Sequence, residues 1–104
     1  TEVGDVTLHS GMRKVRLSGK KVDLTSVEFD LLYLLIRNAG QLVSREEMNR
    51  KVLGRTLSPY DRSIDVHVSK LRKKLGHEVS GVERIRSIRG SGYLYALTPS
   101  EAGG

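Results

Sequence analysis

Two short segments carry the side chains best suited to binding a polyanion. Segment 61–75 has five basic residues and two acids, and segment 84–92 has three arginines and no acid. The rest of the chain holds ten bases and ten acids, so the whole formal net charge of +6 lies in these two segments. Such a surplus points to nucleic acid or an anionic membrane as partner. The basic residues are Arg62, Lys70, Arg72, Lys73, Lys74, Arg84, Arg86 and Arg89.

Segment 61–75 has the period of an amphipathic helix. Its apolar residues follow the spacing i, i+4, i+7 and i+11, which places them on one narrow stripe. Ser58-Pro59 supplies a start signal, with serine as cap and proline at the first helical position, and Gly76 supplies the end. The stripe consists of Ile64, Val68, Leu71 and Leu75.

The face opposite the stripe is basic and hydroxylic and holds no acid. Val66 is apolar where a wet residue is expected, and a thymine methyl group in a major groove would give it a contact. Asp61 and Asp65 lie on the flank beside Arg72, where pairing within the helix is open to them. A solvated surface helix is the simpler alternative, but the joint pattern favours contact with DNA. The donors of this face are Arg62, Ser63, Ser69, Lys70 and Lys73.

The second basic segment lies in a predicted β-hairpin. Residues 85–88 and 93–97 read as strands, and Arg89-Gly90-Ser91-Gly92 is a turn with glycines where a positive φ is needed. Arg89 can reach a minor groove, whose negative potential deepens where the groove narrows. Arg84 and Arg86 precede it at strand spacing, and they could instead guard an exposed edge against aggregation.

The elements that precede these segments are a sheet and two helices. Alternating residues between 5 and 24 predict antiparallel strands. Thr25 with Glu28 is a capping box that opens an apolar helix ending near 38–40, and Ser44 with Glu47 opens a second helix that ends at Gly54. The order predicts an α+β winged helix-turn-helix fold, with an N-terminal antiparallel sheet, three helices and a C-terminal β-hairpin wing.

The 104 residues predict one domain, with an ordered core of about 3–97 and a tail at 98–104. No apolar run is long enough for a membrane span, so no membrane partner is expected. Cysteine is absent, which fits a reducing compartment. The three histidines, His9, His67 and His77, do not lie at metal spacing. No nucleophile–base pair is indicated, and residues 90–92 lack the lysine of a phosphate loop. We therefore expect neither an enzyme nor a cofactor.

Several motifs resemble the effector domain of OmpR/PhoB-type response regulators. They are Asp61–Leu75, followed by Ile88-Arg89-Gly90-Ser91-Gly92-Tyr93, together with 24–32 and 42–47. The resemblance covers residues 3–97. The stretch 52–62 is most similar to the CpxR branch of that family. The implied fold has a four-stranded N-terminal sheet, three helices and a C-terminal hairpin.

The resemblance also implies a function, namely sequence-specific binding of double-stranded promoter DNA by a transcription regulator of a two-component system. Positions matching Arg62, Ser63, Val66 and Lys70 face the major groove in that family, and the position of Arg89 enters the minor groove. Ser69 and Lys70 depart from the commonest pattern, which leaves the base preference open. The positions implied to touch phosphates are Arg45, His67, Arg72, Ser87 and Tyr93, and we add Lys73.

The resemblance implies further partners and a cytoplasmic location. These are a second copy bound head to tail on direct repeats, RNA polymerase at the loop that holds Arg55 and Tyr60, and a separate N-terminal receiver domain with its sensor kinase. Because the chain begins almost directly on a strand, we expect a fragment of a longer regulator. Two alternatives stay open, a non-specific architectural DNA binder and a winged helix that binds an acidic protein.

Overall fold

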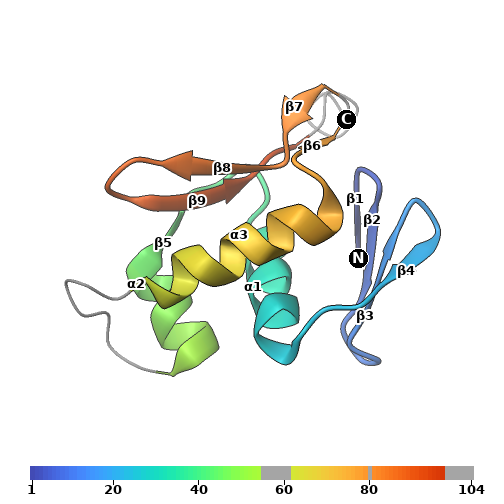
Figure 1. The fold of residues 1–104 in the computed structure, drawn as a ribbon, viewed down its shortest axis with the longest axis horizontal. Coiled ribbons are helices and arrows are strands. Elements are labelled where there is room, and N and C mark those ends of the chain that lie inside the picture. The colour runs from blue at the N-terminus through green and yellow to red at the C-terminus, as the bar shows by residue number, and fades with distance from the viewer. Residues whose placement is uncertain (55–61, 80, 98–104) are drawn as a thin grey trace.

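The computed structural model describes residues 1–54, 62–79 and 81–97. The chain opens with an antiparallel sheet of four strands in sequence order (Figure 1). Val6 and Leu8 on the second strand and Val15 on the third are buried, as their alternation with polar residues predicts. The strands are β1 (Glu2–Val3), β2 (Val6–His9), β3 (Lys14–Leu17) and β4 (Lys20–Val22).

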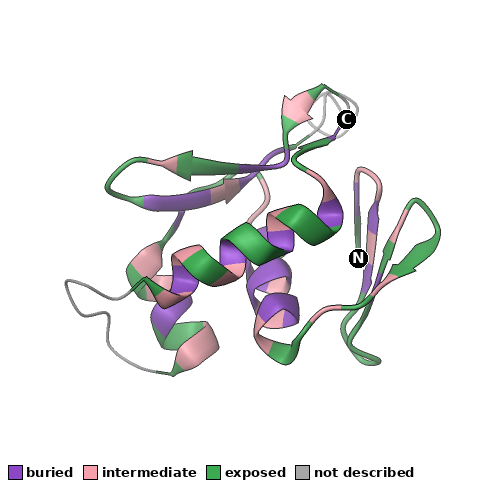
Figure 2. Ribbon diagram, viewed as in Figure 1, coloured by how far each residue is buried: buried purple, intermediate pink, exposed green. Residues whose placement is uncertain are grey.

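Helix α1 (Ser26–Arg37) begins at the predicted capping box. The Thr25 hydroxyl accepts the Glu28 N–H at 3.2 Å, and Glu28 Oε1 accepts the Thr25 N–H at 2.9 Å. These two bonds satisfy donors that a helix start leaves without partners. Seven of the twelve residues of α1 are buried, which makes it the central helix of the core (Figure 2).

The second helical segment changes its winding after one turn. Ser44 caps α2 (Arg45–Met48) by accepting the Glu47 N–H at 3.0 Å, and a π-helical turn, η1 (Asn49–Leu53), follows. Gly54 ends it with a φ of 69°, a left-handed conformation that suits glycine. The helical segment thus ends where the sequence predicts, but residues 49–53 have π-helical rather than α-helical winding. The wider turn there carries the fully buried polar residue Asn49.

Helix α3 (Ser63–Leu75) carries the predicted apolar stripe, and every residue of that stripe is at most 2% exposed. The helix starts after Arg62, whose φ of −109° and ψ of 10° lie outside the helical region and whose side chain makes no capping hydrogen bond. The predicted start at Ser58-Pro59 lies outside the described residues, as do Arg55, Tyr60 and the tail. Gly76 ends the helix as expected.

The C-terminal hairpin is part of a three-stranded sheet in the order β5-β9-β8. β8 (Ile85–Ile88) and β9 (Gly92–Tyr95) form the wing, and the short β5 (Val43–Ser44) pairs with β9 just before α2. Figure 1 shows the wing extending beside α3 and above the start of α2. A separate small hairpin, β6 (Glu78–Val79) with β7 (Val82–Glu83), links α3 to the wing.

The two glycines of the predicted turn have different roles. Gly90 has a φ of 74°, as the turn requires. Gly92 is the first residue of β9, and a Cβ added there would stand 2.1 Å from the carbonyl oxygen of Val43. The close backbone approach predicted at this turn is therefore an approach of β9 to β5, within the domain.

Within the described residues, none of the helices has the length and apolarity needed to cross a lipid bilayer.

Candidate nucleic-acid interface

The exposed face of α3 carries the predicted groove-facing residues. Figure 2 shows exposed segments recurring along α3, alternating with buried and half-buried ones. Val66 is 48% exposed and lies among the cations and hydroxyls of this face. Ser63 is half-buried at the first turn. The exposed residues of this face are Arg62, Val66, Ser69, Lys70 and Lys73.

Asp65, the acid in the first turn of α3, pairs across the domain. Its Oδ1 accepts Arg45 Nε at 2.9 Å and the hydroxyl of Tyr93. Arg62 lies farther away, with Nη1 at 3.9 Å from Oδ2. Among the described residues, Asp65 does not pair with Arg72, and Asp61, the other acid of that expectation, lies outside them. Burial tends to raise the pKa of Asp65, but the bonds from Tyr93 and Arg45 outweigh it, so the pKa lies below its ordinary value.

Two arginines predicted to touch phosphates lie over the ring of Tyr93. The guanidinium carbons of Arg45 and Arg72 are each 5.5 Å from the ring centroid, within the range of a cation–π contact. Arg72 also donates to the carbonyl oxygen of Ile85 from Nε and Nη2, at 3.1 and 2.7 Å, and to Ser87 Oγ at 2.8 Å. Both guanidinium groups are therefore held in place beside the exposed face of α3.

Tyr93 itself is 4% exposed. Burial, with the neighbouring carboxylate of Asp65, raises the pKa of its hydroxyl above the ordinary value. The hydroxyl therefore keeps its proton at neutral pH and donates it to Asp65. Ser87 is exposed on β8, where its Oγ accepts a hydrogen bond from Arg72, and His67 is half-buried on α3.

The wing presents Arg86 and Arg89 but not Arg84. Arg89 is exposed at the hairpin turn, as predicted, and Arg86 is exposed on β8. Arg84 is 1% exposed. Its Nη1 and Nη2 donate to Asp5 Oδ1 and Oδ2 at 2.7 and 2.9 Å, in a two-pronged pair.

Arg84 makes three further hydrogen bonds inside the domain. Nη1 donates to the hydroxyl of Tyr95 at 2.9 Å, Nε to the carbonyl oxygen of Gly76 at 3.1 Å, and Nη2 to that of Glu78 at 3.3 Å. Its assignment to the ligand-facing charge was therefore wrong, and so was the alternative of an edge guard. Arg84 joins the N-terminal sheet to the wing.

Sequence reasoning missed two acids that organise these arginines. Asp5 is 79 positions from Arg84, and Asp65 is 20 positions from Arg45. No local pattern signals either contact. The sequence did contain one indication: Asp65 lies at the edge of the basic face, where its carboxylate would repel a bound polyanion unless a cation of the domain neutralised it.

Comparison with known proteins agrees with this geometry. Residues 19–95 match the family described as "Transcriptional regulatory protein, C terminal". The transcriptional regulatory protein CpxR of Escherichia coli K12 is 44% identical over 93 residues, which are 89% of this chain and 40% of that protein. The chain thus spans about two fifths of the length of the curated relatives that it matches.

Two solved structures have the same fold. The DNA-binding domain of E. coli CpxR is 41% identical with a TM-score of 0.89, over 93% of this chain and 95% of that one. The DNA-binding domain of Klebsiella pneumoniae RstA, in complex with the RstA box, is 38% identical with a TM-score of 0.85, over 92% and 95%. With the sheet, the helices and the wing in place, this chain belongs to the family of C-terminal winged-helix domains of OmpR/PhoB-type transcriptional regulatory proteins.

Proposed function

We propose that the domain binds double-stranded promoter DNA in a sequence-specific manner, with α3 in the major groove and the wing turn at the adjacent minor groove. The single observation that carries this proposal is the exposed face of α3. It combines cations, hydroxyls and one valine, and it holds no acid, because the carboxylate of Asp65 is turned to Arg45 and Tyr93. A major groove offers acceptors and thymine methyl groups to such a mixture.

The proposal divides the contacts with DNA into three groups. Base edges would be read by Arg62, Ser63, Val66, Ser69 and Lys70. The residues that would bind phosphates are Lys73, His67, Ser87, Arg45 and Arg72. The guanidinium groups of Arg45 and Arg72 both lie over the ring of Tyr93. We thus assign Tyr93 to positioning the arginines, since its hydroxyl is engaged and its ring is buried. Arg89 would enter the minor groove.

The relatives support further proposals for the whole regulator. Since this chain is about two fifths of their length, we propose a separate receiver domain controlled by a sensor kinase. We also propose a head-to-tail pair on direct repeats, and contact with RNA polymerase through Arg55 and Tyr60. Footprinting on one and two half-sites tests the pair, because cooperative filling of adjacent sites is expected only when the second copy is in register.

A binding-site selection followed by competition tests sequence specificity. The domain is used to select duplexes from a random library, and the selected site then competes against random duplex in fluorescence anisotropy. We expect the selected site to bind at least about a thousandfold more tightly. A difference below about tenfold would favour a non-specific architectural binder. No measurable binding to duplex at about 50 mM salt would favour a protein partner for the basic face.

A further inference from the structure

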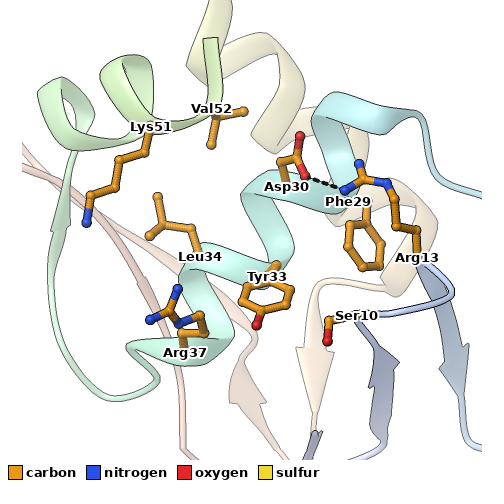
Figure 3. A pocket seen from close by; sticks show the side chains of 9 residues that line it. All are labelled: Ser10, Arg13, Phe29, Asp30, Tyr33, Leu34, Arg37, Lys51 and Val52. Atoms are coloured by element: carbon orange, nitrogen blue, oxygen red, sulfur yellow. Dashed lines mark ion pairs between the residues drawn. The ribbon is translucent and has the colours of Figure 1, made fainter. Parts of the chain in front are cut away.

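A second surface lies on the outer side of α1. Asp30, Tyr33, Leu34 and Arg37 follow the spacing i, i+3, i+4 and i+7, so they share one face of the helix. They line a hollow of about 360 Å³ (Figure 3), a volume within the range of ligand sites. The other lining residues are Ser10, Arg13, Phe29, Lys51 and Val52.

One wall of this hollow, which we name the α1 groove, is built firmly. Arg13, in the turn between β2 and β3, lies over the ring of Phe29 with its guanidinium carbon 4.6 Å from the centroid. Its Nη1 is 3.0 Å from Asp30 Oδ1, and its Nη2 donates to Ser26 Oγ at 2.9 Å. The turn is thereby fixed against the start of α1, and the wall does not depend on a loose side chain.

The floor is apolar and the rim is cationic. Leu34 and the rings of Phe29 and Tyr33 form the floor, with Val52 of η1 on the far side, as Figure 3 shows. Arg37 lies over Tyr33, with its guanidinium carbon 5.6 Å from the ring centroid.

The rim is positive because the described residues that line the groove include three cations and one acid. Asp30 is engaged by Arg13, and Lys51 has only a loose pair with Glu47 at 4.0 Å. Arg37 is exposed and makes no ion pair among the described residues. The groove therefore carries a net charge of +2 from Arg13, Arg37, Lys51 and Asp30.

We propose that the α1 groove binds an acidic amphipathic segment of a separate partner protein. Large apolar side chains of that segment would enter between Tyr33 and Val52, and its carboxylates would pair with Arg37 and Lys51. Charge complementarity selects this occupant. A second copy of this chain, at +6, would bring like charge to a positive rim. A duplex would set its hydrated backbone over an apolar floor.

The placement lets the partner and DNA bind together. The groove residues of α1 lie on the side of the helix opposite Glu28, which pairs with Lys74 of α3, whereas the proposed DNA surface uses the outer face of α3 and the wing turn. The proposal goes beyond DNA binding and does not depend on it, since groove binding and duplex binding are measured separately.

The test uses two synthetic twelve-residue peptides and the domain bound to its selected duplex. One peptide has leucine and phenylalanine at helical spacing with glutamate and aspartate between them, and the other replaces each acid by lysine. Amide chemical-shift changes map the site. We expect saturable shifts on α1 and η1 with the acidic peptide and none with the basic one.

Charge reversal supplies the matched variants. The double variant Arg37→Glu/Lys51→Glu should weaken the acidic peptide by about tenfold, because each reversal replaces attraction at an exposed pair with repulsion. The control Lys20→Glu/Lys21→Glu makes the same charge change on the exposed strand β4. It should leave peptide affinity within about twofold, and both doubles should bind duplex alike.

Four results would overturn the proposal. They are equal binding of the basic peptide, shifts confined to α3 and the wing, an equal loss in the control double, and no shifts at millimolar peptide. Shifts that grow with protein concentration alone would assign the groove to a second copy. Duplex binding lost in the groove double but kept in the control would assign the groove to DNA.

Discussion

The carboxylate of Asp65 joins the start of α2 to the wing, because Oδ1 accepts both Arg45 Nε, at 2.9 Å, and the hydroxyl of Tyr93. An acid at a polyanion-binding surface should by itself weaken binding. Here it directs a cation, Arg45, and holds the tyrosine on which Arg45 and Arg72 rest. Removing the Asp65 carboxylate therefore distinguishes two roles. Duplex binding should tighten if only its negative charge matters, and weaken if it positions Arg45 and Tyr93.

Replacing Asp65 by alanine should weaken duplex binding several-fold, although the variant is more positive. Arg45 would lose its anchor, so the slope of log K against log salt should fall in magnitude by about 1. The control is Asp23→Ala, the same charge change at a fully solvated carboxylate. Anisotropy titrations at several salt concentrations give both quantities. Asp23→Ala should bind duplex slightly more tightly, because it removes one negative charge. The same result for Asp65→Ala would contradict the positioning role of Asp65.

Lys70 and Lys73 should differ in what their removal changes. Lys70→Ala should cost about 1–3 kcal/mol on the selected site and relax preference at one base pair, since we assign it to a base edge. Lys73→Ala should weaken all sequences alike and lower the salt slope by about 1, as a phosphate contact does. Both side chains are exposed, so folding should not change. If Lys70→Ala weakened binding to all sequences equally, Lys70 would be a phosphate contact rather than a base contact.

Arg84→Met should destabilise the fold by about 3–5 kcal/mol, because it leaves Asp5 without its charged partner in a partly buried site. Thermal unfolding of the free domain measures the loss. Arg86→Met, on the neighbouring exposed position, is the matched control and should change stability by at most about 0.5 kcal/mol. If the Arg84→Met domain were as stable as the wild type but bound duplex more weakly, Arg84 would be a DNA contact and its structural role would be wrong.

The stability of the domain should fall with acid through the same pair. The hydrogen bonds from Arg84 outweigh burial and hold the pKa of Asp5 below its ordinary value. A carboxylate with a lowered folded-state pKa stabilises the fold fully above its unfolded pKa, and this contribution is lost as pH falls through the folded pKa. Denaturant unfolding between about pH 5 and pH 2 should therefore show a smaller loss for Asp5→Asn than for the wild-type chain.

Gly92→Ala should separate β9 from β5. Its Cβ would meet three backbone atoms of Val43 and Ser44 at 2.1–2.9 Å, and backbone cannot move aside as a side chain can. We expect a loss of about 2–3 kcal/mol in the free energy of unfolding. Gly11→Ala is the control, since its Cβ would have no atom within 4 Å. An unchanged Gly92→Ala domain would contradict the close approach of the two strands.

Elements with strong local signals were predictable from the sequence. The capping box at Thr25 starts α1, the hydroxyl of Ser44 caps the start of α2, and the apolar stripe of α3 is buried. The π-turn at η1 was not predictable, because π-helical winding is rare and the helical signals at Ser44 and Glu47 do not distinguish it from an α-helix. The two-residue strand β5 is too short to show a period, and only its pairing with β9 defines it.

In the candidate site, too, the features with a local sequence pattern were predictable and those set by tertiary packing were not. The exposed face of α3 followed from periodicity, since its residues lie opposite a strict apolar stripe. Arg84 was misplaced because a sum of charges along one segment takes no account of Asp5, which lies in the distant turn between β1 and β2. The partners of Asp65 were missed for the same reason: side-chain pairs between distant elements depend on tertiary packing.

The pairing of β5 with β9 has a consequence for how DNA would be chosen. It ties the residue before Arg45 to the strand after Arg89, so the two ends of the proposed contact surface cannot move independently. The distance between these two ends of the contact surface is then fixed, so the duplex must change its shape to fit the domain. Sites whose untouched base pairs adopt the required groove width at low cost would be preferred. We therefore expect part of the operator's information to lie in base pairs that no side chain reaches.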